Sequence, residues 1–145
     1  MSVKVSVVED KAALQEAFAI REEVFVVGQA VSWEEEFDEF EETSVHFLAT
    51  DPQGKGLGTA RWRETSDGIK LERFAVLDNA RGQGVGTLLV DAVIANILSQ
   101  KGKGLLLYLH AQLTAIPLYK KFGFIERGEQ FLECDIWHVT MELQT

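Results

Sequence analysis

The glycine-rich segment from Arg81 to Thr87, which reads RGQGVGT, constrains the fold of this chain more than any other stretch. It follows an extended run from Ile69 to Leu77 and leads into a helical pattern that begins near Val85. Glycines let the backbone approach a ligand closely. The first amides of a helix are unpaired and lie at the positive end of its dipole. A strand, a glycine turn and a helix in this order therefore predict an anion site for a phosphate or pyrophosphate.

Two widespread phosphate motifs do not fit this segment. A P-loop requires a lysine before its final Ser or Thr, whereas Gly86 precedes Thr87 here. The dinucleotide fingerprint G-x-G-x-x-G requires a spacing that differs from that of Gly82, Gly84 and Gly86. By pattern alone, a tight strand-to-helix connection without a ligand is an alternative to the anion site.

The spacing Arg81-x-x-Gly84-x-Gly86 resembles the Q/R-x-x-G-x-G/A signature of the GNAT superfamily of N-acetyltransferases. The later stretch AIPLYKKFGF, from Ala115 to Phe124, resembles the A-x-x-x-Y-x-x-x-G-F element of that superfamily. Further segments resemble its small bacterial ElaA/YjcF-like branch, so the resemblance covers nearly the whole chain. These are Arg21–Val26, the acidic segment that ends in Asp38-Glu39, His46, Leu109–Gln112, and Phe131–His138.

The resemblance implies a mixed α/β fold. Its central, mostly antiparallel sheet has about seven strands, splays between the fourth and fifth strands, and is flanked by helices. A length of 145 residues suits one domain, taken as residues 1–145. Apolar periodicity and turn signals predict strands at Val3–Val8, Val45–Thr50, Leu57–Arg63, Lys70–Val76, Leu105–Leu109, Phe124–Glu129 and Ile136–Leu143. Helices are predicted after Asp10, over Gly84–Ser99 and over Ile116–Phe122.

By resemblance, the chain moves an acetyl group from acetyl-coenzyme A to a primary amine within a ternary complex. Residues expected to bind the coenzyme are Phe74, Ala75, Val76, Arg81, Gly82, Gln83, Gly84, Val85, Gly86, Thr87, Gln112, Ala115, Tyr119 and Lys121. The resemblance also makes Tyr119 the acid that protonates the departing thiolate, a role that suits a neutral phenol. The alternative is a tyrosine packed on the sheet with its hydroxyl bonded to backbone.

Glu72 is the candidate base that takes a proton from the amine. Strand alternation is expected to place Glu72, Phe74 and Val76 on one face, next to the coenzyme. The alternative is a surface ion pair with Arg73 or Arg61.

The acceptor site is expected to border the acidic segment from Val27 to Thr43, whose carboxylates would attract a cationic amine. Candidate acceptor-binding residues are Arg21, Asp38, Glu39, His46, His110 and His138. Each has a structural alternative. Arg21 would form a buried ion pair, the carboxylates a solvated helix face, and the histidines satisfied structural positions.

The composition of the chain limits the classes of partner and the cellular compartment that we expect. A formal net charge of −9 disfavours nucleic acid and anionic membranes. With Cys134 as the only cysteine, no internal disulfide can form, and the lack of a signal-peptide pattern points to the cytoplasm. Three scattered histidines and one cysteine do not make a metal-ligand pattern. The identity of the amine and the oligomeric state stay open, although homodimers are common in such folds. A non-catalytic acyl-coenzyme A sensor is the alternative function.

Overall fold

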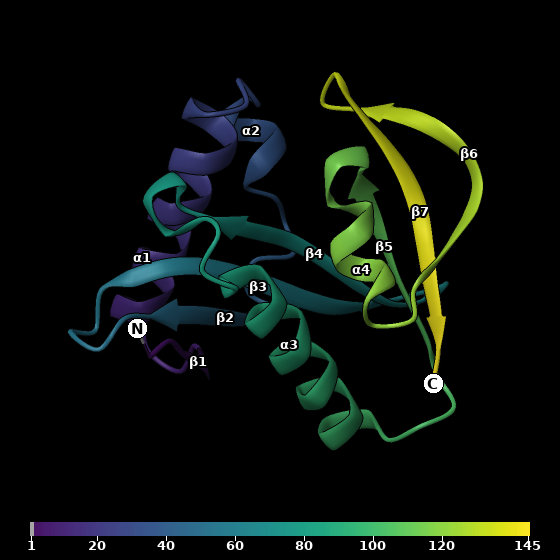
Figure 1. Cartoon of the computed structure of the whole chain (residues 1–145), viewed down its shortest axis with the longest axis horizontal. Coiled ribbons are helices and arrows are strands. Elements are labelled where there is room, and N and C mark those ends of the chain that lie inside the picture. The colour runs from purple at the N-terminus through teal and green to yellow at the C-terminus, as the bar shows by residue number, and fades with distance from the viewer. Residues whose placement is uncertain (1) are drawn as a thin grey trace.

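The structure is a computed structural model in which residues 2–145 are described. Its strands form one seven-stranded sheet in the order β1-β2-β3-β4-β5-β7-β6 (Figure 1). The strands are β1 (Lys4–Val7), β2 (Val45–Thr50), β3 (Gly56–Thr65), β4 (Gly68–Val76), β5 (Leu106–Gln112), β6 (Ile125–Glu133) and β7 (Ile136–Gln144). Helices flank this sheet, so the predicted mixed α/β fold is confirmed.

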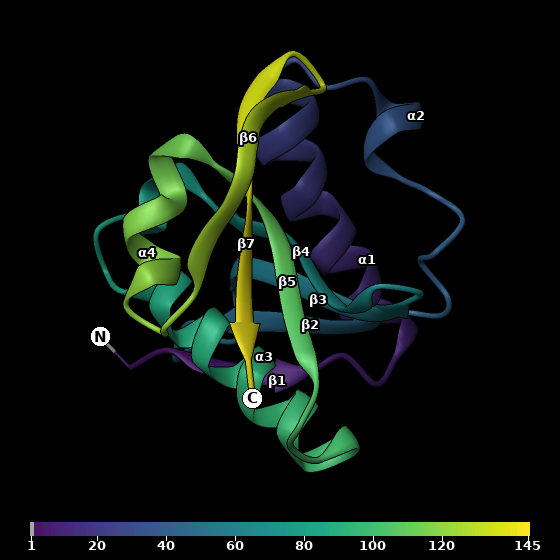
Figure 2. The same cartoon turned by 90° about the vertical axis from the view of Figure 1, so that its right-hand side faces the viewer.

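Helices cover both faces of the sheet (Figure 2). On one face, α1 (Lys11–Arg21) runs directly into the π-helix η1 (Glu22–Val27), and the short helix α2 (Trp33–Glu36) follows. On the other face lie α3 (Val85–Lys101) and α4 (Ile116–Lys120), with the 3-10 turns η2 (Asp78–Ala80) and η3 (Leu113–Ala115) before them. Asp10 caps α1 as expected, because its side chain accepts a 2.8 Å hydrogen bond from the Ala13 amide. Within residues 2–145, no helix has the length and apolar character needed to cross a membrane.

The sheet splits in its middle, between β4 and β5. These two strands are parallel, and they pair only at Ile69↔Leu107 and Lys70↔Tyr108 before they diverge. The other neighbouring strands are antiparallel. The split between the fourth and fifth strands is therefore confirmed, and it leaves an opening that passes through the sheet.

A β-bulge in β4 changes which side chains face which side. Arg61 pairs with Glu72 and Thr59 with Ala75, so two steps along β3 match three along β4. Arg73 is the extra residue, and its φ of +60° lies in the left-handed region. The expectation that Glu72, Phe74 and Val76 share one face is therefore wrong. Phe74 and Val76 pack with the core beneath α3, whereas Glu72 lies on the face of α1.

Most element boundaries differ from the predictions by a few residues, and two of these differences bear on the site. The predicted helix after Asp10 continues to Val27, but its last six residues are a π-helix, so the regular 3.6-residue stripe ends at Arg21. Strand β6 extends to Glu133, four residues past its predicted end, and carries that carboxylate to the mouth of the split.

Candidate active site

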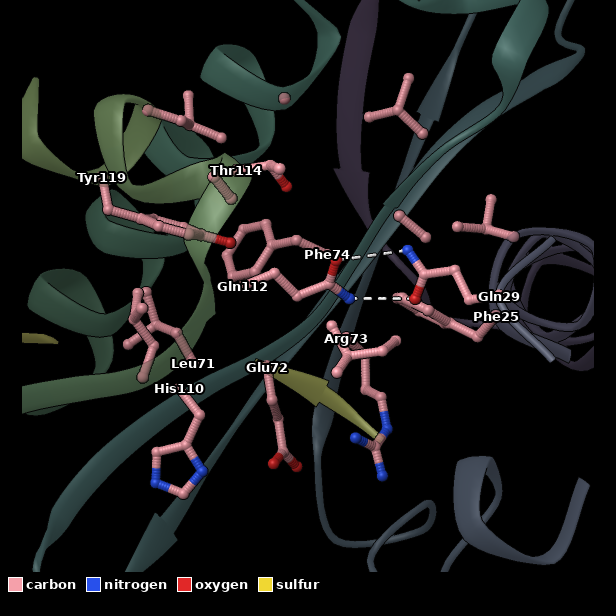
Figure 3. A pocket seen from close by; sticks show the side chains of 18 of the residues that line it. Phe25, Gln29, Leu71, Glu72, Arg73, Phe74, His110, Gln112, Thr114 and Tyr119 are labelled. Carbon is pink, nitrogen blue, oxygen red and sulfur yellow. Dashed lines mark hydrogen bonds between the residues drawn. The ribbon is translucent and has the colours of Figure 1, made fainter. Parts of the chain in front are cut away.

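A cavity of about 610 Å³ occupies the split between β4 and β5 (Figure 3). One end is formed by the glycine-rich segment before α3, and the other by the β6–β7 hairpin and the segment after η1. The lining thus joins both sides of the sheet, and a ligand in this cavity would touch residues distant in sequence.

The glycine-rich end has the geometry of an anion site. Gly82 and Gly84 have φ of +77° and +78°, a region that costs other residues energy. Gly84 is the N-cap of α3, and no side chain caps the helix there. A Cβ built on Gly84 would meet no atom within 4 Å, so the space before the helix is open. The positive end of the α3 dipole therefore faces free space.

Most residues predicted to bind a coenzyme line this cavity. Of that set, Gln83 and Lys121 do not line it. The Gln83 side chain instead donates a 3.4 Å hydrogen bond to the Asn79 carbonyl. The Arg81 side chain is largely exposed and lies 3.3 Å from an Asp78 carboxylate oxygen.

Tyr119 reaches the cavity from α4 (Figure 3). Its ring packs edge-on against Phe74, with ring centroids 5.7 Å apart, and against Phe124 at 6.2 Å. Among residues 2–145 the hydroxyl has no hydrogen-bond partner, so the backbone bond expected of a purely structural tyrosine is not formed. Burial raises the pKa of Tyr119 above its usual range, and the hydroxyl stays protonated at neutral pH.

Glu72 lies in the cavity wall but is held by cations. Arg61 hydrogen-bonds its Oε2, the Arg63 Nε donates to the same oxygen at 2.8 Å, and the Lys70 Nζ lies 3.3 Å from Oε1. Burial alone would raise the pKa of Glu72, but these positive charges outweigh it and lower the pKa to about 2. A carboxylate so stabilised has little tendency to take a proton at neutral pH. The ion-pair alternative with Arg61 is present, in buried form.

Arg21 lies outside the cavity. It is 1% exposed, and its guanidinium bonds Glu36 Oε2 at 2.9 Å and both carboxylate oxygens of Glu41, at 2.7 and 2.8 Å. The Phe37 ring stacks on it at 4.7 Å. This is the buried ion pair that the sequence offered as the structural alternative.

Three other predicted acceptor residues also lie outside the cavity lining. Asp38 bonds Arg61 at 2.8 Å and Arg73 at 3.1 Å. His46 is buried, and its Nε2 lies 2.7 Å from the Glu41 carbonyl oxygen. Glu39 is exposed. Of the six predicted residues, His110 and His138 are the two that line the cavity.

Several lining residues were not predicted from the sequence. Gln29 and Gln112 exchange two hydrogen bonds, of 3.3 and 3.0 Å, across the middle of the cavity (Figure 3). Gln29 follows η1 and is 83 positions from its partner, so no local pattern could identify it. Arg73 and Glu133 also line the cavity. Glu133 lies in the resembling segment Phe131–His138, which was the only available signal for it.

Cys134 is a poor nucleophile in this setting. Partial burial and the neighbouring Glu35 carboxylate, which accepts a 3.4 Å hydrogen bond from the thiol, raise the pKa of Cys134 to about 11. A thiol at neutral pH is a weak nucleophile, and direct attack of the amine on the thioester stays a prediction.

Comparison with known proteins identifies the family. Residues 8–145 match the family described as "Acetyltransferase (GNAT) domain". The uncharacterized N-acetyltransferase YjcF of Bacillus subtilis is 38% identical over 140 residues, which cover 96% of this chain and 98% of YjcF. An acyl-CoA N-acyltransferase from Pseudomonas aeruginosa superposes with a TM-score of 0.86 at 25% identity, covering 97% of this chain and 99% of that one. Escherichia coli ElaA has the same TM-score and coverage at 23% identity. The predicted resemblance is confirmed, and the chain belongs to the GNAT family of acetyltransferases.

Proposed function

We propose that this protein transfers an acetyl group from acetyl-coenzyme A to a primary amine. One observation carries the proposal. A single cavity joins the uncapped N-terminus of α3, which suits a pyrophosphate, to the unbonded hydroxyl of Tyr119. GNAT acetyltransferases use acetyl-coenzyme A, and the Pseudomonas aeruginosa neighbour is described as an acyl-CoA N-acyltransferase.

The pantetheine arm would lie between β4 and β5. The open edge of β4 near Phe74 and Val76 would pair with its amides as an added strand does, and one main-chain N–H would polarise the thioester carbonyl. Gln112 would exchange its bonds to Gln29 for a pantetheine amide. Tyr119 would then give its proton to the departing thiolate.

The acceptor amine would enter from the α1 face. Glu35, Glu36 and Glu133 contribute negative charge to that end of the cavity, against the positive charge of Lys70 and Arg73. The role of Glu72 as base stays a prediction, and its three cationic partners weigh against it. A cytoplasmic location and a homodimer also stay predictions.

Calorimetric titration with acetyl-coenzyme A tests the proposal. We expect micromolar binding, about −8 kcal/mol, that disappears in Gly84→Glu, because an anionic side chain would occupy the pyrophosphate site. Gly54→Glu is the control. Gly54 has a φ of +84°, has open space around it, and lies in the turn between β2 and β3, so the variant adds the same charge at a glycine of positive φ outside the cavity lining. No binding by the wild-type protein, or equal loss in both variants, would contradict the proposal.

Turnover separates an enzyme from a non-catalytic acyl-coenzyme A sensor. A panel of spermidine, glucosamine and lysine, assayed by release of free thiol from acetyl-coenzyme A, should contain at least one acceptor class that is acetylated. Tight coenzyme binding with no thiol release for any amine would favour the sensor.

A further inference from the structure

Three side chains from three strands gather at the acceptor end of the cavity. They are His110 on β5, Glu133 at the end of β6 and His138 on β7. The His110 Nδ1 lies 3.3 Å from Glu133 Oε1, and the His138 Nε2 lies 3.7 Å from Glu133 Oε2. The register places His138 opposite both Gln112 and Phe131, so the β5–β7–β6 order brings the two rings to one carboxylate.

The Glu133 carboxylate sets which nitrogen of His110 carries a proton. The hydrogen bond from His110 lowers the pKa of Glu133, against the opposing effect of burial, so this carboxylate is ionised and can only accept. Nδ1 of His110 must therefore donate, and in the neutral ring Nε2 keeps its lone pair. Among residues 2–145, Nε2 of His110 has no hydrogen-bond partner.

The ring of His110 is fixed in place but accessible. The Phe131 ring packs against it edge-on, with ring centroids 5.0 Å apart, and Tyr108 lies at 6.2 Å. The side chain is 28% exposed and lines the cavity. A fixed ring with one free nitrogen can receive a proton from a ligand without first losing a structural bond.

His110 lies as far along the split between β4 and β5 as Glu72 does. Lys70↔Tyr108 is the last pair between β4 and β5, and Glu72 and His110 each follow it by two residues. Figure 3 shows both side chains on the same side of the Gln29–Gln112 bridge, with Tyr119 on the other. Of these two groups at the split, Glu72 is paired with three cations, whereas Nε2 of His110 has no partner among residues 2–145.

We propose that His110, positioned by Glu133, is the base that accepts the proton of the attacking amine. The proposal rests on the proposed function. The nitrogen of the neutral amine forms a bond to the thioester carbon and loses one proton to His110 Nε2. The carbonyl then re-forms, the C–S bond breaks, and the sulfur keeps the electron pair and takes a proton from Tyr119. The imidazolium then gives its proton to solvent, and the tyrosinate takes a proton from solvent.

Charged groups on every neighbouring strand line the same cavity as this base. Lys70 and Glu72 on β4 lie at the apex of the split, Glu133 on β6 bonds the ring, and His138 on β7 lies beyond Glu133. A substitution of Glu133 therefore changes the orientation of His110, whereas a substitution of His110 removes the proton acceptor itself.

Steady-state kinetics with the best acceptor from the amine panel test the role of His110 as the base. In His110→Ala we expect turnover at neutral pH to fall about 100-fold or more, with acetyl-coenzyme A affinity unchanged. The acidic limb of the pH profile of kcat should disappear, and added imidazole should restore activity. Glu133→Gln should lower turnover and should shift the acidic limb of the pH profile of kcat without removing it. The matched control is Glu126→Gln on the same strand, which loses an exposed pair with Lys120 and should retain the wild-type profile.

Nitrogen-15 NMR of the histidine rings gives a readout that needs no acceptor. In the wild-type protein at neutral pH, with or without acetyl-coenzyme A, His110 should carry its proton on Nδ1, and Glu133→Gln should perturb that preference. A proton on Nε2, or a His110→Ala variant that keeps the acidic limb, overturns the proposal. If coenzyme binding is absent from the calorimetry, the proposed function fails, and the NMR result still decides whether the His110–Glu133 pair is arranged as described.

Discussion

At Tyr119 the ring and the hydroxyl have different surroundings. The ring is packed between Phe74 and Phe124, whereas the hydroxyl has no hydrogen-bond partner among the described residues. Removing the oxygen therefore leaves the packing intact, and a Tyr→Phe change at this site tests chemistry rather than stability.

Tyr119→Phe should lower turnover about 100-fold and leave the Kd for acetyl-coenzyme A nearly unchanged, because the variant cannot give a proton to the thiolate. Steady-state kinetics and calorimetry measure the two effects. Tyr108→Phe is the matched control, since the hydroxyl of this second tyrosine bonds Thr65 at 2.6 Å outside the cavity. Weaker binding without a loss of turnover would make Tyr119 a packing residue.

Single residues could be predicted where a short motif carries them. The glycines before α3 and Tyr119 come from such motifs, and the structure brings them to one cavity. Gln29 could not be predicted, because its contact with Gln112 depends on how η1 packs beside the end of β5. Arg21 was ambiguous in sequence, since a buried arginine can serve a ligand or other side chains.

Strand β4 shows how one element redirects its side chains. The bulge at Arg73 places a non-glycine residue at a φ of +60°, in a region that β-strands do not use. The guanidinium is held by Asp38 at 3.1 Å, and a Glu36 oxygen lies 3.5 Å away. The strained backbone is therefore maintained by contacts on the α1 face.

We expect Arg73→Gly to be more stable than Arg73→Ala by about 1 kcal/mol. Both variants lose the guanidinium, but glycine adopts a positive φ without steric cost. Chemical denaturation measures the difference. Lys70 on the same strand gives the control pair, since it has no positive φ, and there glycine should be the less stable by about 0.5–1 kcal/mol. An Arg73→Ala variant as stable as Arg73→Gly would show that the bulge carries no strain.

The bulge also explains why the faces of β4 could not be predicted. Alternation has a period of two, so one extra residue reverses every assignment beyond it. Nothing in the segment Leu71–Val76 marks Arg73 as the extra residue, because glycine, which commonly signals a bulge, is absent from it. The seven strands themselves were predictable, since each is an apolar run between turn residues, and the split followed from family resemblance.

An ion network joins several parts of the whole molecule. Glu41 bridges Arg21 on α1 and Arg61 on β3, at 2.7 and 2.8 Å, and Arg61 continues to Asp38 and to Glu72 on β4. Burial would raise the pKa of Asp38 and Glu72, but the arginines lower both to about 2. Ionised carboxylates in the folded state therefore contribute stability above their ordinary pKa values, and this contribution is lost as the pH falls toward 2.

Glu72→Gln should lower the free energy of unfolding at pH 7 by about 3 kcal/mol, because three cations lose their shared anion. The deficit should shrink as the pH falls from 4.5, the ordinary value for glutamate, toward 2, where the wild-type carboxylate is protonated as well. Urea denaturation across this range measures it, with Glu126→Gln as an exposed control. A deficit that does not change with pH would contradict the proposed linkage.

The split has a consequence for the lifetime of the protein in a cell. Strands β1–β4 and β5–β7 share backbone pairs at Ile69 and Lys70 alone, so the two parts of the sheet are held together mainly by the apolar core to which both contribute. A coenzyme that bonded both strands would tie these parts together, and stability would rise with the logarithm of its concentration. Unliganded copies would open more often and be degraded first. The abundance of the protein would then follow the supply of acyl donor, with no separate regulator.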